Sequence, residues 1–495
     1  MSRIIIQNGN MCELDLPLKF AQKLYNEFAI RHPNAFYLRT RQRGMQNWDG
    51  KIHYITKTGQ FKIGLLPKVY DMCIEMGIKP KVVDMRQPLP KVSKVVTNIG
   101  KYKLRPEQEK AVKEVINNKI GNTPFHIGVL DYTVNAGKTL IMSSLYLSYK
   151  KQLKTLLITN DSDWLNQARE EFKQYLPGED ITFVQGKVLN WSNFTIGMVQ
   201  SISRNMRFYQ KELSQIDMVL IDEADQGGSK QYQNVITRLF NTRIRIGLSG
   251  TIYMSKLAKD RVKNMNLECF FGKVIAEFKL KDSIKRGYST KTVVKMVPGK
   301  PWYGNWESDC ISYKEIYDDS ITNCYTAWLM AYNRLLWNLN QGRYPALVVC
   351  KHIAHCENLY KFFKKKLGDA YNIAYVHVNT PSKLRQQIMK DFREGKIDIL
   401  VSTTIIARGK NFPKLRYLLN AASMDSQEKS IQFLGRLVRT DKSKKKVYLD
   451  DLHYPGPYLD RHGKHRKQYY QRQELKVILL DKLWKKHPNH SLIKS

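Results

Sequence analysis

The apolar stretch Ile127–Leu130 is followed by Tyr132-Thr133-Val134-Asn135-Ala136-Gly137-Lys138-Thr139, and an apolar, helix-forming segment comes next. A strand, a tight loop and a helix in this order place loop amides and a helix N-terminus around phosphate groups. We predict that Asn135, Ala136 and Gly137 surround the phosphates. Lys138 is expected to reach the β- and γ-phosphates, and the Thr139 hydroxyl to hold Mg²⁺. The alternative is a lysine that opens an ordinary helix, because Tyr132 stands where the usual motif has its first glycine.

An acidic group follows a second apolar strand, Met218–Ile221, as Asp222-Glu223-Ala224-Asp225. Ligands of open α/β sheets bind at the carboxyl ends of the strands. Asp222 is therefore expected to hold Mg²⁺ through water, and Glu223 to accept a proton from the attacking water. The alternative is a solvated acidic start of a helix, where carboxylates are favoured by the helix dipole.

The third motif is Gln432-Phe433-Leu434-Gly435-Arg436-Leu437-Val438-Arg439. Arg436 and Arg439 are three residues apart, so we expect both on one face of a helix. Two guanidinium groups there would neutralise the charge that develops on a transferred phosphoryl group. The alternative is a basic helix face that contacts a phosphate backbone or solvent.

Apolar strands alternate with helical segments from about residue 104 onward, which predicts mostly parallel, doubly wound sheets. The rhythm occurs twice, so we expect an α/β fold with two tandem domains, 96–285 and 286–495, joined by residues 285–340. The predicted strands are Ile127–Leu130, Thr155–Thr159, Thr195–Val199, Met218–Ile221 and Ile244–Leu248, then Ala346–Cys350, Ile373–Val378, Ile397–Ser402, Tyr417–Ala421 and Lys446–Asp450.

Residues 1–95 are predicted to form a small, basic α+β domain that binds DNA. We expect a helix over Leu16–Ala29 and a strand pair formed by Phe36–Thr40 and Lys51–Thr56. The domain has 16 Lys and Arg against 7 Asp and Glu, a net charge of 16 − 7 = +9. Basic residues interleaved with aromatic ones suit phosphate contact and base stacking. The residues predicted to contact nucleic acid are Arg39, Arg41, Arg43, Trp48 and Lys51, although Trp48 could equally belong to the core.

The composition favours a polyanionic partner. The chain has 495 residues, of which 82 are Lys or Arg and 44 are Asp or Glu, so the net charge is 82 − 44 = +38. Such an excess favours nucleic acid first and an acidic membrane surface second. No apolar run is long enough for a spanning helix, and no secretion signal is recognisable. The seven scattered cysteines contain no C-x-x-C pair, which predicts a reducing, cytoplasmic compartment without a zinc site.

The three motifs together resemble those of a superfamily-two helicase with two RecA-like domains, and the resemblance covers about residues 102–480. It implies ATP as the nucleotide, Mg²⁺ as the metal ion, and Gln432, Arg436 and Arg439 as catalytic residues beside Lys138, Asp222 and Glu223. Further segments occur in the expected order. They are the adenine-reading segment Leu104–Gln108 with Gln108 as reader, the DNA-contacting segment Thr195–Ile202 with Gln200 and Ser201, the coupling motif Ser249-Gly250-Thr251, and Ser402–Pro413 with Gly409 in the nucleotide site.

The N-terminal stretch Asn47-Trp48-Asp49-Gly50-Lys51-Ile52 also resembles the first domain of the phage UvsW helicases. That resemblance implies a DNA helicase of recombination and replication restart. Its substrates would be forks, four-way junctions and RNA–DNA hybrids, through fork regression, branch migration and R-loop unwinding. Single-strand-binding or recombination proteins are possible partners, and a membrane is not expected. The work would take place in the cytoplasm or nucleoid of a host.

Three other functions remain open at this point. An RNA helicase shares the sequence Asp-Glu-Ala-Asp, but its last motif usually begins with His-Arg, where this chain has Gln432. A nucleic-acid clamp without catalysis is disfavoured by the intact Lys138, Asp222, Glu223 and Arg436. The motor of a restriction enzyme would need a nuclease site, and no pattern of paired acids and a lysine stands out.

Overall fold

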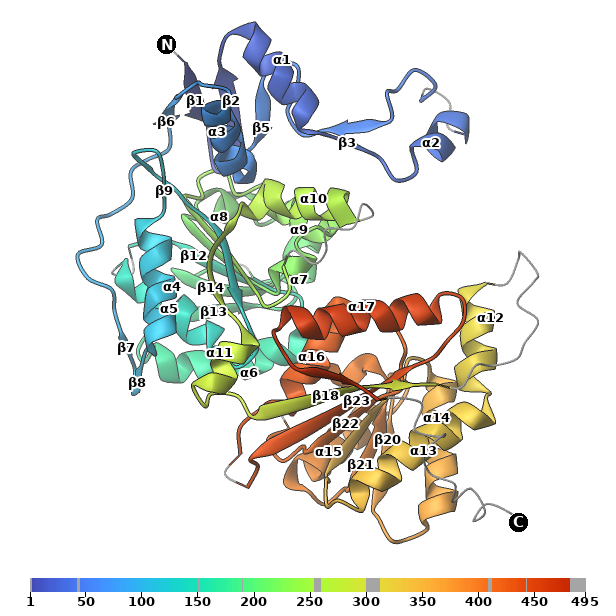
Figure 1. Ribbon diagram of the computed structural model, residues 1–495. Coiled ribbons are helices and arrows are strands. Elements are labelled where there is room, and N and C mark those ends of the chain that lie inside the picture. The colour runs from blue at the N-terminus through green and yellow to red at the C-terminus, as the bar shows by residue number, and fades with distance from the viewer. Residues whose placement is uncertain are drawn as a thin grey trace. The chain divides into compact units, whose positions relative to one another are not determined.

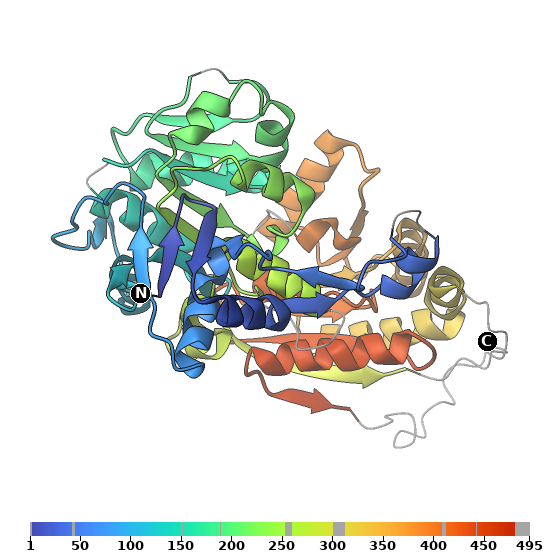
Figure 2. The ribbon, with the colours of Figure 1, turned by 90° about the horizontal axis from the view of Figure 1, so that it is seen from above.

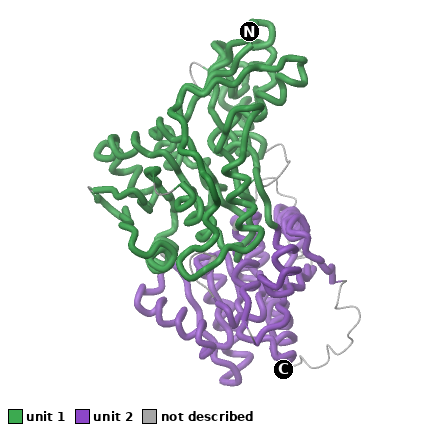
Figure 3. Tube along the Cα trace, turned by 90° about the vertical axis from the view of Figure 1, so that its left-hand side faces the viewer, with its two compact units in different colours: residues 1–278 green, residues 279–495 purple. Residues whose placement is uncertain are grey.

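The computed structural model describes residues 2–41, 45–149, 152–188, 190–252, 260–299, 312–407, 412–441 and 443–480. The chain forms two compact units, residues 1–278 and 279–495 (Figure 3). The first unit contains the N-terminal region and the first α/β domain. That α/β domain alone is called lobe 1 below, and the second unit is called lobe 2. Within the described residues, no helix is long and apolar enough to cross a membrane. The predicted limits at residues 95 and 285 stay predictions.

Lobe 1 is built on a sheet of seven parallel strands in the order β13-β14-β12-β15-β16-β11-β17. The central strands are almost completely buried, as expected for a parallel sheet covered on both faces. Five predicted strands are confirmed, whereas the half-exposed edge strands β13 and β17 were not recognised. The bounds are β11 (His126–Tyr132), β12 (Thr155–Thr159), β13 (Ile181–Val184), β14 (Phe194–Met198), β15 (Met218–Asp222), β16 (Ile244–Ser249) and β17 (Val274–Phe278).

The helices of lobe 1 form two groups with the sheet between them (Figure 1). One group consists of α4 (Pro106–Asn117), α5 (Lys138–Ser148) and α6 (Ser162–Tyr175). The other consists of α7 (Val199–Arg204), α8 (Gln210–Ser214), α9 (Lys230–Ile236) and α10 (Arg261–Phe271). Two short hairpins precede the sheet, β7 (Asn98–Ile99) with β8 (Tyr102–Lys103) and β9 (Lys119–Ile120) with β10 (Thr123–Pro124).

Lobe 2 repeats this topology with its own seven parallel strands, in the order β20-β21-β19-β22-β23-β18-β24. Numbered within each lobe, both orders read 3-4-2-5-6-1-7, so the prediction of two RecA-like domains is confirmed. The strands are β18 (Lys291–Pro298), β19 (Ala346–Val349), β20 (Ile373–Val376), β21 (Ile399–Ser402), β22 (Tyr417–Asn420), β23 (Lys446–His453) and β24 (Val477–Leu479). The helices are α11 (Leu280–Lys285), α12 (Tyr313–Tyr317), α13 (Tyr325–Leu339), α14 (Ile353–Leu367), α15 (Ser382–Glu394), α16 (Gln427–Leu437) and α17 (Leu459–Arg472).

The stretch 285–340, which was expected to join the two domains, also contributes a strand to the sheet of lobe 2. Strand β18 lies inside this stretch and pairs with β23 and β24 in the sheet of lobe 2. Its sequence, Lys-Thr-Val-Val-Lys-Met-Val-Pro, mixes lysines with apolar residues, and buried positions alternate with partly exposed ones. Such a half-buried strand lacks the continuous apolar run that marks the other strands of a parallel sheet.

The N-terminal region has a four-stranded sheet in the order β5-β2-β1-β6, in which β1 pairs antiparallel with β2 and parallel with β6. Its strands are β1 (Arg3–Ile6), β2 (Met11–Asp15), β5 (Gln60–Lys62) and β6 (Lys81–Asp84), and its helices are α1 (Leu18–Glu27) and α3 (Leu66–Glu75). An arm, residues 29–53, extends away from this sheet (Figures 1 and 2). It consists of β3 (Ala29–Arg31), α2 (Ala35–Arg41) and β4 (Lys51–His53).

The expected strand Phe36–Thr40 is wrong, because these residues form helix α2. The strand that pairs with Lys51–His53 is β3, in antiparallel register from Ala29↔His53 to Arg31↔Lys51. The aromatic run that suggested a strand is largely exposed, so no sheet partner selects the extended form. The backbone groups are instead satisfied locally, as in the 3.0 Å hydrogen bond from the Leu38 N–H to the Asn34 carbonyl.

The N-terminal sheet shares one hydrophobic core with lobe 1. The guanidinium of Arg245, on β16, is fully buried and donates to the Gly9 carbonyl (2.6 Å) and to Asn10 Oδ1 (2.8 Å). Gly64 approaches the first lobe so closely that a Cβ there would collide with the Glu268 carbonyl. The N-terminal region is thus docked on lobe 1, and its removal would expose a buried charge and part of a core.

Candidate nucleotide and nucleic-acid sites

The loop after β11 is shaped by two residues in the left-handed region of the backbone. Asn135 has φ 65° and Gly137 has φ 72°. Gly137 must be glycine for a second reason, because a Cβ there would lie 2.3 Å from Nε2 of Gln108. Helix α5 begins at Lys138, so Lys138 and Thr139 occupy its first turn. The predicted strand–loop–helix arrangement is therefore present.

Three buried polar atoms in this loop make no hydrogen bond to any residue that the structure describes. They are the Thr133 hydroxyl oxygen and both side-chain amide atoms of Asn135. Buried polar groups in folded proteins nearly always have partners, so such a cluster indicates a missing ligand. The oxygens of a polyphosphate would accept hydrogen bonds from the Thr133 hydroxyl and from Asn135 Nδ2, whereas Asn135 Oδ1 needs a donor.

Tyr132, which replaces the first glycine of the usual motif, does not disturb the loop. It is the last residue of β11, its ring is buried, and its hydroxyl donates to the Glu107 carbonyl over 2.8 Å. The side chain is therefore part of the packing between β11 and α4. The tight loop itself starts at Thr133.

Gln108 braces the phosphate loop from α4. Its Nε2 donates to the Ala136 carbonyl over 2.8 Å, and its Oε1 accepts from the backbone N–H of Arg105 over 2.8 Å. Arg105 in turn donates to the Asn135 carbonyl over 3.3 Å. The predicted adenine reader is thus buried against the loop, and its role in reading adenine stays a prediction.

Asp222 ends strand β15, two strands away from β11 in the parallel sheet, so both carboxyl ends lie at the same edge. The Asp222 side chain is buried. This burial raises the pKa of its carboxyl group, while the Lys138 ammonium acts in the opposite direction. The structure thus brings together two residues that are far apart in the sequence. The Lys138 ammonium offsets only part of the cost of burying the Asp222 carboxylate. A cation bound beside the two residues would offset more of it.

The coupling motif ties the acidic group to the loop. The Ser249 hydroxyl donates to Asp225 over 2.7 Å, and the backbone N–H of Thr251 donates to the Ser249 oxygen over 3.1 Å. Gly250 passes so close to the loop that a Cβ would lie 3.2 Å from the Thr133 Cα. A change in the phosphate loop would therefore reach the Asp222–Asp225 segment through direct contacts.

A side-chain network that the sequence did not indicate joins the predicted DNA-contacting helix α7 to Glu223. Gln200 Nε2 donates to the Asn160 carbonyl over 3.3 Å, and the Asn160 side chain donates to Gln226. Gln226 Nε2 then donates to Glu223 Oε2 over 3.5 Å. The sequence assigned no role to Asn160 or Gln226, and their contacts become visible only in three dimensions. Ser201 instead accepts a hydrogen bond from the Gly186 N–H over 2.9 Å.

In lobe 2, Gln432 and Arg436 lie on α16, as expected, and both are half-buried. The prediction that Arg439 shares their helix face was wrong, because α16 ends at Leu437. The backbone after the helix turns toward the start of β18, where the Thr290 hydroxyl donates to the Arg439 carbonyl over 3.1 Å. Gly409 and the neighbouring Arg408 lie outside the described residues.

Lobe 2 also contains a basic recess at the carboxyl ends of its strands, which the sequence analysis did not single out. Its lining includes Lys351, after β19, and Lys429, at the start of α16. Burial and the neighbouring Lys429 ammonium lower the pKa of Lys351. The Lys351 ammonium lies 4.0 Å from the ring centroid of Tyr313, and Lys429 donates to the Thr404 hydroxyl over 3.3 Å. Two partly buried cations at a strand edge suit a phosphate group.

The predicted contact residues of the N-terminal region all lie on the arm. Arg39 and Arg41 are exposed on α2, and the Arg41 guanidinium lies 4.9 Å from the ring centroid of Tyr37. Trp48 is half-buried. Its Nε1 donates to the Lys51 carbonyl over 2.9 Å, and its ring meets the His32 ring edge-on. Lys51 itself is exposed. Trp48 therefore has a structural role in the arm. Arg43 lies outside the described residues.

Comparisons with known proteins agree with this architecture. Residues 101–254 match the model of the res subunit of type III restriction enzymes, and residues 329–441 match the helicase conserved C-terminal domain. The ATP-dependent DNA helicase uvsW of Enterobacteria phage T4 is 22% identical over 451 residues, which cover 82% of each chain. Putative helicase 22 of a Sulfolobus islandicus filamentous virus is 23% identical over 71% of this chain, which spans 64% of that relative's length.

The fold is also found among solved structures. A fragment of a putative HsdR subunit of a type I restriction enzyme from Vibrio vulnificus superposes with a TM-score of 0.55. It shares 16% sequence identity, and the match covers 76% of this chain and 67% of the fragment. At this identity the likeness establishes the arrangement of strands and helices.

Proposed function

We propose that this chain, a member of the superfamily-two helicases and hence an ATP-hydrolysing enzyme, moves along DNA and acts where duplexes branch. The observation that carries the nucleotide site is the loop Thr133–Gly137, where the buried side-chain polar atoms of Thr133 and Asn135 find no partner in the described protein, beside the buried Asp222. The branch preference rests on the basic arm and on the similarity to uvsW over most of both chains.

The residues of the loop would hold the triphosphate of ATP. Asn135 and Thr133 supply hydrogen bonds that the protein leaves unused, and Lys138 supplies a positive charge at the start of α5. We propose that Thr139 and Asp222 hold Mg²⁺, since a hydroxyl and a buried carboxylate fit the oxygen ligands that this ion prefers. When bound, Mg²⁺ would supply positive charge that neutralises the charge developing on the phosphate groups.

The hydrolytic step is assigned to Glu223. This residue follows Asp222 with φ 53°, a conformation unusual for a residue other than glycine, so its backbone turns sharply at the strand end. Strained positions of this kind cluster at functional sites. Glu223 would orient the attacking water and accept its proton, and Gln432, Arg436 and Arg439 keep their predicted role of serving the transition state.

Nucleic acid would be bound by dispersed basic surfaces rather than by one patch. Helix α7 in lobe 1, the recess with Lys351 and Lys429 in lobe 2, and the arginines of the arm are separate candidates for phosphate contacts. Binding should then weaken steeply with salt, with a slope of roughly −0.9 in log K per neutralised phosphate on duplex DNA. A flat salt titration would contradict this assignment.

The proposed function is tested by measuring ATP hydrolysis on a panel of nucleic acids of equal length. The panel contains linear duplex, single strand, fork, four-way junction, RNA–DNA loop and single-stranded RNA. We expect the largest stimulation by the forked and four-way DNA. Equal stimulation by RNA would favour an RNA helicase. Hydrolysis without unwinding or branch migration on any substrate would refute the helicase assignment.

A further inference from the structure

We propose that the arm is a stacking element for unpaired bases, in which Phe36 receives a base exposed at the branch and Arg31 and Arg39 hold the adjoining phosphates. This inference rests on the proposed function and specifies which part of the substrate the arm recognises. Its occupant is a nucleotide outside the base-paired stack.

The first observation is the exposure of two adjacent aromatic rings at the start of α2. Phe36 is 80% exposed and Tyr37 is 54% exposed, whereas Ala35 beside them is buried. A single exposed apolar side chain needs no explanation, but two neighbouring rings at the end of an extended arm form an apolar surface available to a ligand. Aromatic faces among arginines are the combination with which proteins bind unpaired bases.

The second observation is that the arm is held in shape by specific contacts rather than by a core of its own. The Asp49 carboxylate lies 2.7 Å from His53 Nε2, and the His53 ring stacks on Tyr25 of α1 at 4.1 Å. The backbone N–H of His32 donates to the Gly50 carbonyl over 2.8 Å, where Gly50 has φ 78°. The backbone N–H of Ala35, the first residue of α2, donates in turn to the His32 carbonyl over 3.0 Å, so the start of α2 is attached to the paired strands β3 and β4. The rings are therefore presented in a defined position.

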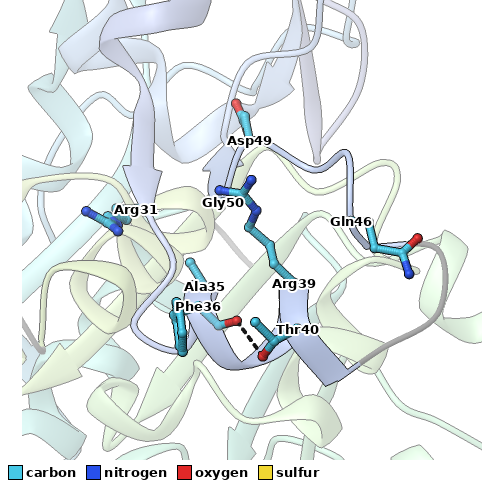
Figure 4. A pocket seen from close by; sticks show the side chains of 8 residues that line it. All are labelled: Arg31, Ala35, Phe36, Arg39, Thr40, Gln46, Asp49 and Gly50. Atoms are coloured by element: carbon cyan, nitrogen blue, oxygen red, sulfur yellow. Dashed lines mark hydrogen bonds between the residues drawn. The ribbon is translucent and has the colours of Figure 1, made fainter.

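The third observation is a recess of about 400 Å³ between α2 and the segment 45–50 (Figure 4). Its volume lies within the range of small-ligand sites, which leaves room for one nucleotide. In Figure 4, Arg31 and Phe36 lie at one side, Gln46 lies at the opposite side, and Arg39 points toward Asp49. The lining is Arg31, Ala35, Phe36, Arg39, Thr40, Gln46, Asp49 and Gly50, with two guanidinium groups and one carboxylate.

The chemistry of the recess selects an unpaired nucleotide. In a continuous duplex both faces of each base are covered by its neighbours, so Phe36 has no face to contact. A fork or junction exposes the last base pair and the bases displaced from it. The lining has a net positive charge, which attracts the phosphate of that nucleotide. An apolar peptide without acidic residues has no group for this charge to attract. Stacking on an aromatic ring is worth about 5- to 150-fold in affinity per base.

The experiment uses the full chain and a fork that carries 2-aminopurine as the first unpaired base. Fluorescence and the fork-to-duplex affinity ratio are measured for the natural protein, Phe36→Ala, Phe36→Trp and Leu18→Ala. Leu18 is the matched control, because it is 79% exposed in the same domain but lies on α1. We expect Phe36→Ala to lose the fluorescence change and about 10-fold in the affinity ratio. Phe36→Trp should keep both, and Leu18→Ala should behave like the natural protein.

Several results would overturn the proposal. Unchanged fluorescence and affinity ratio in Phe36→Ala would show that no base stacks there, as would equal losses for fork and duplex. Loss of both in Leu18→Ala would show a general effect of removing exposed apolar surface. A thermal melt of each variant excludes misfolding, and retention by Phe36→Trp argues against it independently. If the natural protein itself shows no fork preference, the proposed function fails, and that outcome is separate from the result for Phe36.

The phosphate contacts are tested by Arg31→Gln and Arg39→Gln. For binding to forks, each change should make the slope of log K against log[salt] shallower by about 0.9, which corresponds to the loss of one phosphate contact. The same slopes as the natural protein would remove both arginines from the site.

Discussion

The two lobes have the same strand order but use the ends of corresponding strands in opposite ways. In lobe 1, β15 ends at Asp222, and the loop after β11 leaves the side-chain polar atoms of Thr133 and Asn135 without partners in the described protein. In lobe 2, the corresponding strand β22 ends at Asn420, whose side chain donates to Asp451 over 2.8 Å. One lobe keeps hydrogen-bonding capacity available for a ligand, whereas the other uses it internally.

The internal network of lobe 2 is completely buried. Arg466, on α17, pairs with Asp451 at 2.9 Å, and both side chains are inaccessible to solvent. The Tyr470 hydroxyl donates to the same carboxylate over 2.8 Å. The charge of Asp451 is therefore compensated within the lobe, while that of Asp222 is offset only in part by Lys138. The same scaffold thus carries the proposed ligand site in one copy and a structural ion pair in the other.

The comparison is tested most severely by Glu223→Gln, which keeps the shape of the side chain and removes the base. ATP turnover should fall by about 10²- to 10⁴-fold, while binding of ATP with Mg²⁺ is kept. Filter binding and single-turnover kinetics measure the two separately. Loss of binding with normal single-turnover rates would contradict the assignment of Glu223 as base.

The corresponding test in lobe 2 is Arg466→Met, which leaves Asp451 buried without its cation. The free energy of unfolding of lobe 2 should fall by about 3–5 kcal/mol, measured by denaturant titration. The double variant Arg466→Met with Asp451→Leu should recover much of this loss, because no unpaired charge remains. If the single variant is as stable as the natural protein, the network is not the structural counterpart of the ligand site.

Lys138→Ala removes the cation whose charge acts on Asp222 in lobe 1. Turnover should fall by about 10²- to 10³-fold, with DNA binding largely kept because the basic surface is dispersed. Steady-state hydrolysis and fork binding measure these effects. Lys383→Ala is the control, because that lysine is exposed near the start of α15 in lobe 2. Near-normal hydrolysis by Lys138→Ala would remove the nucleotide from this loop.

The smallest expected effect concerns the network between α7 and Glu223. Asn160→Ala breaks the side-chain link to Gln226 and should reduce the stimulation of hydrolysis by DNA about 2- to 30-fold. Hydrolysis without DNA should change less. Asn241→Ala serves as control, since the Asn241 side chain donates to the Ser214 carbonyl, outside this network. Equal losses with and without DNA would show that Asn160 only supports the site.

Much of this architecture could be predicted from sequence, because buried parallel strands have continuous apolar runs and the phosphate loop is a local motif. The exceptions have physical reasons. Strand β18 carries lysines at its half-exposed positions, and Phe36–Thr40 has strand-forming residues without a sheet partner. Arg439 lies beyond the end of α16 at Leu437, and the apolar residues Leu437 and Val438 before it give no sequence signal that the helix ends there. The roles of Asn160 and Gln226 depend on contacts between distant segments, for which local patterns give no signal.

The buried guanidinium of Arg245 has a consequence for the time at which the chain completes its fold. Its acceptor at Gly9 precedes it by 236 residues. At a synthesis rate of about 5–20 residues per second, roughly 10 to 50 seconds separate the appearance of the two residues. During this interval the apolar side chains of Ile63 and Leu65 lack their packing partner α10, which is synthesised later. The N-terminal region can therefore complete its packing only after the chain has been synthesised as far as α10.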